Sequence, residues 1–211
     1  MDSMDSTGDQ ELPLRERKKR ETRQRISDLA TVLIGERGFE AVTVAEIARA
    51  AGVSPMTVFN YFPRKEDLFL DRIPQAVDLF CAAVRDRAPG EPPLAALRRL
   101  ALRLLEERHP LGGVGETFAD FWRVVVASPA LRARAREGVE EIERALTDAL
   151  GEAGVADPAL AAALTVAAYR TVFLASVRRL LAGDPVEEVA RDHRGRLEAA
   201  FGALERAGVA G

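Results

Sequence analysis

The stretch of sequence that decides the fold is residues 43–65, which reads Thr-Val-Ala-Glu-Ile-Ala-Arg-Ala-Ala-Gly-Val-Ser-Pro-Met-Thr-Val-Phe-Asn-Tyr-Phe-Pro-Arg-Lys. Thr43 and Glu46 have the spacing of a capping box at the start of a short helix. Gly52 can adopt the positive φ that ends this helix. Ser54 followed by Pro55 is a favourable start for a second helix. Two short helices joined by a glycine-containing turn are typical of a helix-turn-helix.

The second of these helices has two different faces. Val58 and Phe62 are four residues apart and are predicted to pack inward. The residues left for the outer face and the exposed start are Pro55, Met56, Thr57, Phe59, Asn60 and Tyr61. Their hydroxyl and amide groups can bond to phosphates or to base edges of DNA. An ordinary helical hairpin with polar outer residues would have the same spacing, so spacing alone leaves both interpretations open.

Two adjoining segments resemble the DNA-binding signature of the tetracycline-repressor (TetR) family of bacterial transcriptional regulators. They are Arg37-Gly38-Phe39-Glu40-Ala41-Val42-Thr43-Val44-Ala45-Glu46-Ile47-Ala48 and Gly52-Val53-Ser54-Pro55-Met56-Thr57-Val58-Phe59-Asn60-Tyr61-Phe62-Pro63-Arg64-Lys65-Glu66-Asp67-Leu68. The resemblance implies a homodimer that binds a double-stranded, pseudo-palindromic DNA operator, usually as a repressor. It also implies a larger helical domain that dimerises and binds a small-molecule effector.

The resemblance also assigns roles to single residues. The positions that match phosphate contacts are Thr43, Ser54, Thr57, Tyr61 and Lys65, and those that match base contacts are Pro55, Met56 and Asn60. At position 59 the family usually has a tyrosine. Phe59 keeps the ring and lacks the hydroxyl, so we expect one polar contact fewer there.

The distribution of charge agrees with a DNA-binding N-terminal part. Residues 15–65 contain eleven Lys and Arg against six acidic residues, whereas the whole chain of 211 residues has a net charge of −3. A basic module on an acidic body is typical of proteins that bind nucleic acids. A run of charges can also be plain solvated surface, so this pattern supports the assignment without deciding it.

The sequence also predicts where the protein resides. The single cysteine, Cys81, excludes an internal disulfide and suits a reducing compartment. The first 25 residues are polar and charged, unlike a signal peptide. The longest nearly apolar run, residues 159–169, is too short to cross a bilayer. We therefore expect a cytoplasmic protein without a membrane partner.

Helical periodicity and turn residues predict an all-α chain of about nine helices. The expected domains are a disordered tail (1–14), a helix-turn-helix DNA-binding domain (15–63) and a helical domain for effector binding and dimerisation (64–211). A helix from Lys65 towards Ala88 should be kinked at Pro74. The helices at about 158–182, expected to be deeply buried, and 186–206 carry extensive apolar stripes, which a two-fold dimer would cover.

A pocket for a small, largely apolar effector is expected among the ring side chains of three central helices. These residues are Phe80, Phe118, Phe121, Trp122, Tyr169 and Phe173. Arg123 and Arg170 each lie within a hydrophobic helix and therefore need a partner or a polar cavity, where they could meet an anionic ligand or an internal carboxylate. Aromatic residues on helices can equally be plain core, and the sequence leaves this alternative open.

The sequence lacks the groupings of residues that catalysis or metal binding requires. His109 and His193 have no ligand-like neighbours at metal spacing, and Cys81 lies among apolar residues, as a core thiol does. The loop at 111–115 lacks the Lys-Ser/Thr of a phosphate-binding loop. We expect neither a metal nor a cofactor, and no enzymatic activity. The alternatives are a helical small-molecule carrier or enzyme, or a module that uses the second helix against another protein.

Overall fold

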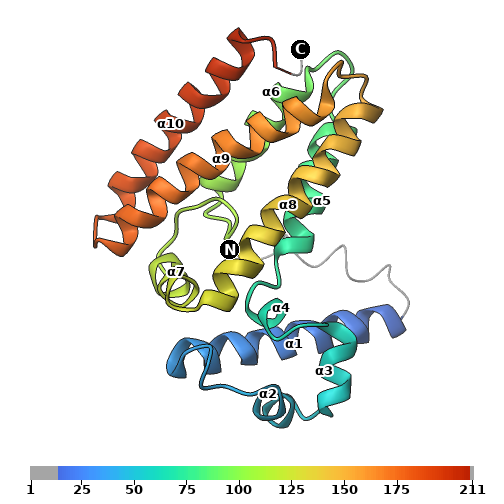
Figure 1. Cartoon of the computed structure of the whole chain (residues 1–211), viewed down its shortest axis with the longest axis vertical. Coiled ribbons are helices and arrows are strands. Elements are labelled where there is room, and N and C mark those ends of the chain that lie inside the picture. The colour runs from blue at the N-terminus through green and yellow to red at the C-terminus, as the bar shows by residue number, and fades with distance from the viewer. Residues whose placement is uncertain (1–13, 210–211) are drawn as a thin grey trace, which may run out of the picture. The chain divides into compact units, whose positions relative to one another are not determined.

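The computed structural model describes residues 14–209, and this part of the chain contains ten helices and no strand (Figure 1). The prediction of an all-α fold is therefore confirmed. The predicted disordered tail lies outside the described residues, apart from Leu14, which begins the first helix. The helices are α1 (Leu14–Arg37), α2 (Val44–Ala50), α3 (Pro55–Tyr61), α4 (Glu66–Phe69), α5 (Ile73–Arg85), α6 (Pro93–Glu106), α7 (Phe118–Ala127), α8 (Pro129–Glu152), α9 (Pro158–Leu181) and α10 (Val186–Arg206).

The chain forms two compact units, which divide between Asp71 and Arg72. Helices α1 to α4 belong to the N-terminal unit, and α5 to α10 belong to the C-terminal unit. The expected boundary between residues 63 and 64 divides the DNA-binding part from the part for effector binding and dimerisation. This functional boundary stays a prediction.

The N-terminal unit is built on α1. This helix buries Ile26, Ala30 and Ile34, which share one helical face, and α2 and α4 pack against it. Gly38 ends the helix with a φ of 85°, a conformation that side chains with a Cβ rarely adopt. The hydroxyl of Ser27 donates a hydrogen bond of 2.6 Å to the carboxylate of Asp71, so α1 is tied to the residues that follow α4.

The predicted long helix from Lys65 towards Ala88 is not continuous. Helix α4 ends at Phe69, and α5 begins at Ile73 with Pro74 in its first turn. Proline has no N–H, and inside a helix its ring would clash with the carbonyl group four residues earlier, here that of Leu70. The first turn avoids both problems because its amides need no helical partner. Pro74 therefore starts a new helix instead of kinking an existing one.

The C-terminal unit is a bundle in which α9 packs against α7, α8 and α10, and α5 packs against α6 and α8 (Figure 1). Side chains cap the starts of two of its helices. Ser128 accepts a hydrogen bond from the Leu131 amide at the start of α8, and Asp157 accepts one from the Leu160 amide at the start of α9. The core is formed mainly by aliphatic residues of α5, α6, α8, α9 and α10.

Helices α9 and α10 differ from the expected pattern of burial. Helix α9 is not buried all round, because Leu160 and Leu164 on it are 54% and 38% exposed. In α10, His193 and Leu197 are fully buried inside the chain itself. Among the described residues, α9 alone is long and apolar enough to cross a membrane, and 39% of its most apolar 18-residue segment is buried. Core helices of soluble proteins share this composition, and α9 packs against three neighbouring helices.

Candidate functional site

Helix α3 is held in place by its first residues and by its buried face. The Thr57 amide donates a 3.0 Å hydrogen bond to the hydroxyl oxygen of Ser54, and the two hydroxyl oxygens are 2.8 Å apart. Val58 and Phe62 are buried, as predicted. The predicted N-cap at Ser54 is therefore confirmed, and the remaining sides of α3 are free to form a surface.

The opposite face of α3 is open to solvent. Met56 and Phe59 are 69% and 46% exposed, and Pro55 and Asn60 are exposed beside them. Their steps of one, three and one place these four residues on one side of the helix. Thr57 and Tyr61 are half-buried at the border of this side. The structure thus brings together the residues expected to face bases, and we call Pro55, Met56, Phe59 and Asn60 the α3 outer face.

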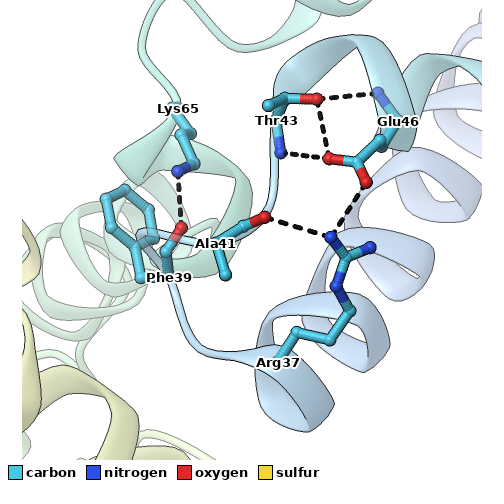
Figure 2. A network of polar contacts seen from close by, with 6 residues as sticks. All are labelled: Arg37, Phe39, Ala41, Thr43, Glu46 and Lys65. Carbon is cyan, nitrogen blue, oxygen red and sulfur yellow. Dashed lines mark hydrogen bonds and ion pairs between the residues drawn. The ribbon is translucent and has the colours of Figure 1, made fainter.

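The start of α2 carries a network of polar contacts (Figure 2). The Glu46 amide donates to the Thr43 hydroxyl oxygen, and the Thr43 amide donates to a Glu46 carboxylate oxygen at 2.8 Å, which confirms the capping box. Arg37, at the end of α1, donates to the other Glu46 oxygen at 2.9 Å and to the carbonyl oxygen of Ala41 at 3.1 Å. Hydrogen bonds from the Thr43 amide and hydroxyl, and then from Arg37, lower the pKa of Glu46 to about 2.

Lys65 makes contacts that sequence reasoning missed. Its ammonium group donates a 2.5 Å hydrogen bond to the carbonyl oxygen of Phe39 and lies 4.1 Å from the centroid of the Phe39 ring (Figure 2). Residues 15–20, which are basic apart from Glu16, form the first turns of α1.

The six aromatic residues proposed for an effector site form one connected cluster in the C-terminal unit, which we call the aromatic cluster. The Phe80 ring of α5 is 5.4 Å from the Tyr169 ring of α9, which is 6.3 Å from the ring of Phe173. Phe173 in turn lies 5.5 Å from both Phe118 and Trp122 of α7. Phe121 completes the cluster at 5.9 Å from Trp122.

Polar groups lie at the edges of the aromatic cluster. The Tyr169 hydroxyl donates a 2.7 Å hydrogen bond to the Leu111 carbonyl oxygen, and burial raises the pKa of this tyrosine. Nε1 of Trp122 and Nε2 of His193 are buried without a hydrogen-bond partner among the described residues. Gly113, in the loop before α7, lies close to both His193 and the aromatic cluster. A Cβ at this position would be 2.8 Å from His193 and 3.0 Å from Phe173.

Sequence reasoning missed the environment of His193. Its Nδ1 lies 2.8 Å from the Ser176 hydroxyl oxygen, and burial lowers the pKa of this histidine to about 4. The signal was present, because His193 occupies a position in the apolar stripe of α10. A histidine at such a position must be neutral and hydrogen-bonded to be tolerated.

The two arginines proposed beside the aromatic residues are not buried. Arg123 is exposed and forms an ion pair of 2.5 Å with Asp120, three residues earlier in α7. Arg170 is also exposed. The expectation that each charge needs an internal partner or a polar cavity was therefore wrong. Each helix has one solvent-facing side, on which an arginine carries no desolvation cost.

Comparison with known proteins assigns the N-terminal unit to a protein family. The family described as "Bacterial regulatory proteins, tetR family" matches residues 26–71. The HTH-type transcriptional regulator TcmR of Streptomyces glaucescens is 35% identical over 133 residues, which are 62% of this chain and 59% of TcmR. The chain spans between 41% and 59% of the lengths of the curated relatives it matches.

Solved structures extend the similarity to both units. The structure of Thermus thermophilus FadR, a TetR-family transcriptional repressor in complex with lauroyl-CoA, is 30% identical, with a TM-score of 0.50. The match covers 85% of this chain and 93% of FadR. The structure of SmeT, the repressor of an efflux pump in Stenotrophomonas maltophilia, has a TM-score of 0.56 at 19% identity and covers 86% of this chain and 89% of SmeT. This second similarity concerns the fold alone.

Proposed function

Because this chain belongs to the TetR family of bacterial regulatory proteins, we propose that it binds an operator in duplex DNA through α3 and represses transcription from the cytoplasm. The observation that carries this proposal is the α3 outer face. Met56 and Phe59 are large apolar side chains that remain exposed beside the amide of Asn60. A helix with one buried side and one such open side has the form that enters a major groove.

In this proposal the residues of α3 and its surroundings divide two tasks. Thr43, Ser54, Thr57, Tyr61 and Lys65 bond to phosphates, which position the protein and carry no sequence information. Pro55, Met56, Phe59 and Asn60 face the bases, where an amide can make a bidentate contact with adenine. The Ser54 and Thr57 hydroxyls already bond to each other, so each retains only part of its capacity for a phosphate.

We propose further that the protein is a homodimer and that α9 lies in the interface. The support is the exposure of Leu160 and Leu164, which occupy one side of α9 at a spacing of four residues. A second copy related by a two-fold axis would cover this side. Dimer symmetry would then require an operator with two half-sites in inverted orientation.

The proposed effector is a small, largely apolar molecule that binds at the aromatic cluster. Connected aromatic rings with a few polar atoms at their edge are typical of ligand sites. The buried Nε1 of Trp122, without a partner among the described residues, offers a hydrogen-bond donor there. Thermus FadR, 30% identical, was solved with lauroyl-CoA, so an acyl-CoA is a suitable first probe. We include neither Arg123 nor Arg170 in this site, since both are exposed.

The test is an in vitro selection of duplexes by the full chain, followed by mobility-shift titrations at several salt concentrations. We expect a pseudo-palindromic sequence and an affinity that falls as salt rises, because phosphate contacts release counterions. Asn60→Ala should change the preferred bases at a cost of about 1–3 kcal/mol.

Two other results would decide for the competing interpretations. A helical carrier or enzyme should bind no duplex and show no dependence on salt. A module that uses α3 against another protein should select no preferred sequence, even if it binds DNA weakly through its basic residues.

A further inference from the structure

We propose that Arg23 is a positioning residue for the α3 outer face: its side chain, on α1, holds the C-terminal end of α3 in place. The inference rests on the proposed DNA binding. It names a residue outside α3 that affects which bases this helix prefers, and it concerns contacts within the N-terminal unit only.

The Arg23 side chain lies over the ring that anchors the end of α3. Its guanidinium carbon, Cζ, is 4.6 Å from the centroid of the Phe62 ring. A planar guanidinium at such a distance is attracted by the ring and packs on its face. Nη2 of Arg23 also donates a long hydrogen bond of 3.4 Å to the carbonyl oxygen of Asp71. The side chain therefore joins α1 both to Phe62 and to the last residue of the N-terminal unit.

The acceptor of this hydrogen bond is itself held in place. The hydroxyl of Ser27 donates to the Asp71 carboxylate at 2.6 Å. Residues 23 and 27 are four apart and share one side of α1. Asp71 is thus bonded through its carboxylate and its carbonyl group to neighbouring turns of one helix, which restricts Arg23 to its place over the Phe62 ring.

Phe62 determines how the end of α3 is seated. Its side chain is 1% exposed, and its amide closes the last turn by donating to the Val58 carbonyl oxygen at 2.9 Å. At the other end of α3, the Ser54 cap fixes the first turn. The two ends of α3 are therefore held by different residues, and Arg23 acts at the end nearer to Asn60.

This difference between the two ends predicts a graded effect on base preference. At 1.5 Å per residue, Asn60 is about 3 Å along the helix from Phe62, whereas Met56 is about 9 Å away. If the Phe62 ring shifts while the Ser54 cap stays fixed, the end of α3 moves more than its start. Loss of Arg23 should therefore weaken the preference for the bases that Asn60 faces more than for those that Met56 faces.

The experiment compares variants of the full chain with the wild type. Arg23→Ala removes the guanidinium, and Phe62→Leu removes the ring and keeps an apolar side chain. The double variant Arg23→Ala/Phe62→Leu completes a double-mutant cycle, which isolates the contact between the two side chains. Arg25→Ala is the matched control, because it removes the same charge from an exposed position on the same helix.

Base preference is measured one base pair at a time. Duplex selection by Asn60→Ala and by Met56→Ala first identifies the base pairs whose preference depends on each side chain. Operators with single substitutions at these base pairs are then titrated with every variant at several salt concentrations. Thermal melting and amide exchange at residues 57–62 accompany the titrations.

A positioning role predicts that Arg23→Ala lowers the preference at the Asn60 base pairs about five- to tenfold, and at the Met56 base pairs by less than about twofold. Phe62→Leu should affect the same base pairs, and the double variant should lose less than the two single effects combined. The melting temperature of Arg23→Ala should fall by about 2–6 °C. Its amide exchange should rise more at residues 60–62 than at residues 57 and 58. Arg25→Ala should keep the wild-type preference at every base pair.

Two results would overturn the inference. The first is an equal loss of affinity for all duplexes in Arg23→Ala with a salt slope lower by about 0.9, because a lost phosphate contact has this effect. The second is wild-type base preference in Arg23→Ala, which leaves Arg23 a purely structural role even if the melting temperature falls. If the wild-type chain binds no duplex, the proposed function fails and the role of Arg23 in DNA binding fails with it. Melting of the four chains of the cycle would then still show whether Arg23 holds Phe62.

Discussion

Nδ1 of His193 lies 2.8 Å from the hydroxyl oxygen of Ser176, so a fully buried imidazole joins α10 to α9. The other ring nitrogen has no partner among the described residues. Burial disfavours the charged form of the ring, and this effect outweighs the attraction of the nearby Asp192 carboxylate. The histidine is therefore neutral in the folded protein near neutral pH, and its protonation opposes folding.

The first prediction concerns stability as a function of pH. The pKa of His193 is lowered to about 4 in the folded chain, whereas an unfolded chain has the ordinary value of about 6.5. Between these values the unfolded state binds more protons, so stability is complete above pH 6.5 and falls as the pH drops towards 4. We expect a loss of about 2 kcal/mol between pH 7 and pH 5. Denaturant titrations of the wild type and His193→Asn test this, since the variant should show a flatter profile over that interval.

The second prediction concerns what the exposed apolar residues of α3 recognise. In a major groove, Met56 and Phe59 can make apolar contacts with the methyl groups of thymine. Replacing a contacted thymine by uracil should weaken wild-type binding about fourfold, which corresponds to the burial of one methyl group. Met56→Ala should be insensitive to the replacement at its own position. Equal affinity of the wild type for thymine and uracil operators at every position would contradict this role.

The third prediction separates the proposed interface from the core. Leu160→Glu places a charge on the exposed side of α9, and we expect it to weaken dimers about 10- to 100-fold without unfolding the chain. Leu197→Ala should instead destabilise the fold itself by about 2–5 kcal/mol, because Leu197 is fully buried within one chain. Sedimentation and thermal melting of both variants check the distinction. A wild-type chain that is monomeric at micromolar concentration would remove α9 from consideration as an interface.

The fourth prediction concerns the effector. Trp122 is the single tryptophan and lies in the aromatic cluster, so its fluorescence should report an apolar ligand, or lauroyl-CoA, whose acyl chain is apolar. An effector that prefers one arrangement of the protein should weaken operator binding roughly 5- to 150-fold. By reciprocity, operator DNA should weaken the ligand equally. If a broad panel alters neither the fluorescence nor the melting temperature, the cluster is plain core. Binding without a change in operator affinity would leave a ligand site that has no regulatory effect.

Local sequence signals predicted much of the N-terminal unit. The capping box at Thr43 and the N-cap at Ser54 depend on residues three apart in sequence, so the pattern alone contains the whole interaction. The contact of Lys65 with Phe39 joins residues 26 apart. No local pattern indicates such a contact, and the family resemblance directed attention to phosphate instead.

In the C-terminal unit, too, the sequence predicted the local structure but not the contacts between distant residues. Periodicity located its helices, because each buries an apolar stripe. It did not tell which side of α9 remains exposed, nor that Arg123 and Arg170 lie on solvent-facing sides. The connection of Phe80 with Tyr169, and of Phe173 with Trp122, depends on how three helices pack. Such packing is decided by tertiary contacts, which a single sequence does not display.

The break at Pro74 has a consequence for the length of the connection between the two units. In one continuous helix, each inserted residue would turn everything after it by about 100°. Between Phe69 and Ile73 the chain is not helical, so a residue inserted there would add at most about 3.6 Å of reach and impose no fixed rotation. A single glycine inserted after Asp71, the last residue of the N-terminal unit, should therefore be tolerated by the fold of each unit. The same insertion in the middle of α5 would move its buried residues out of register with α8.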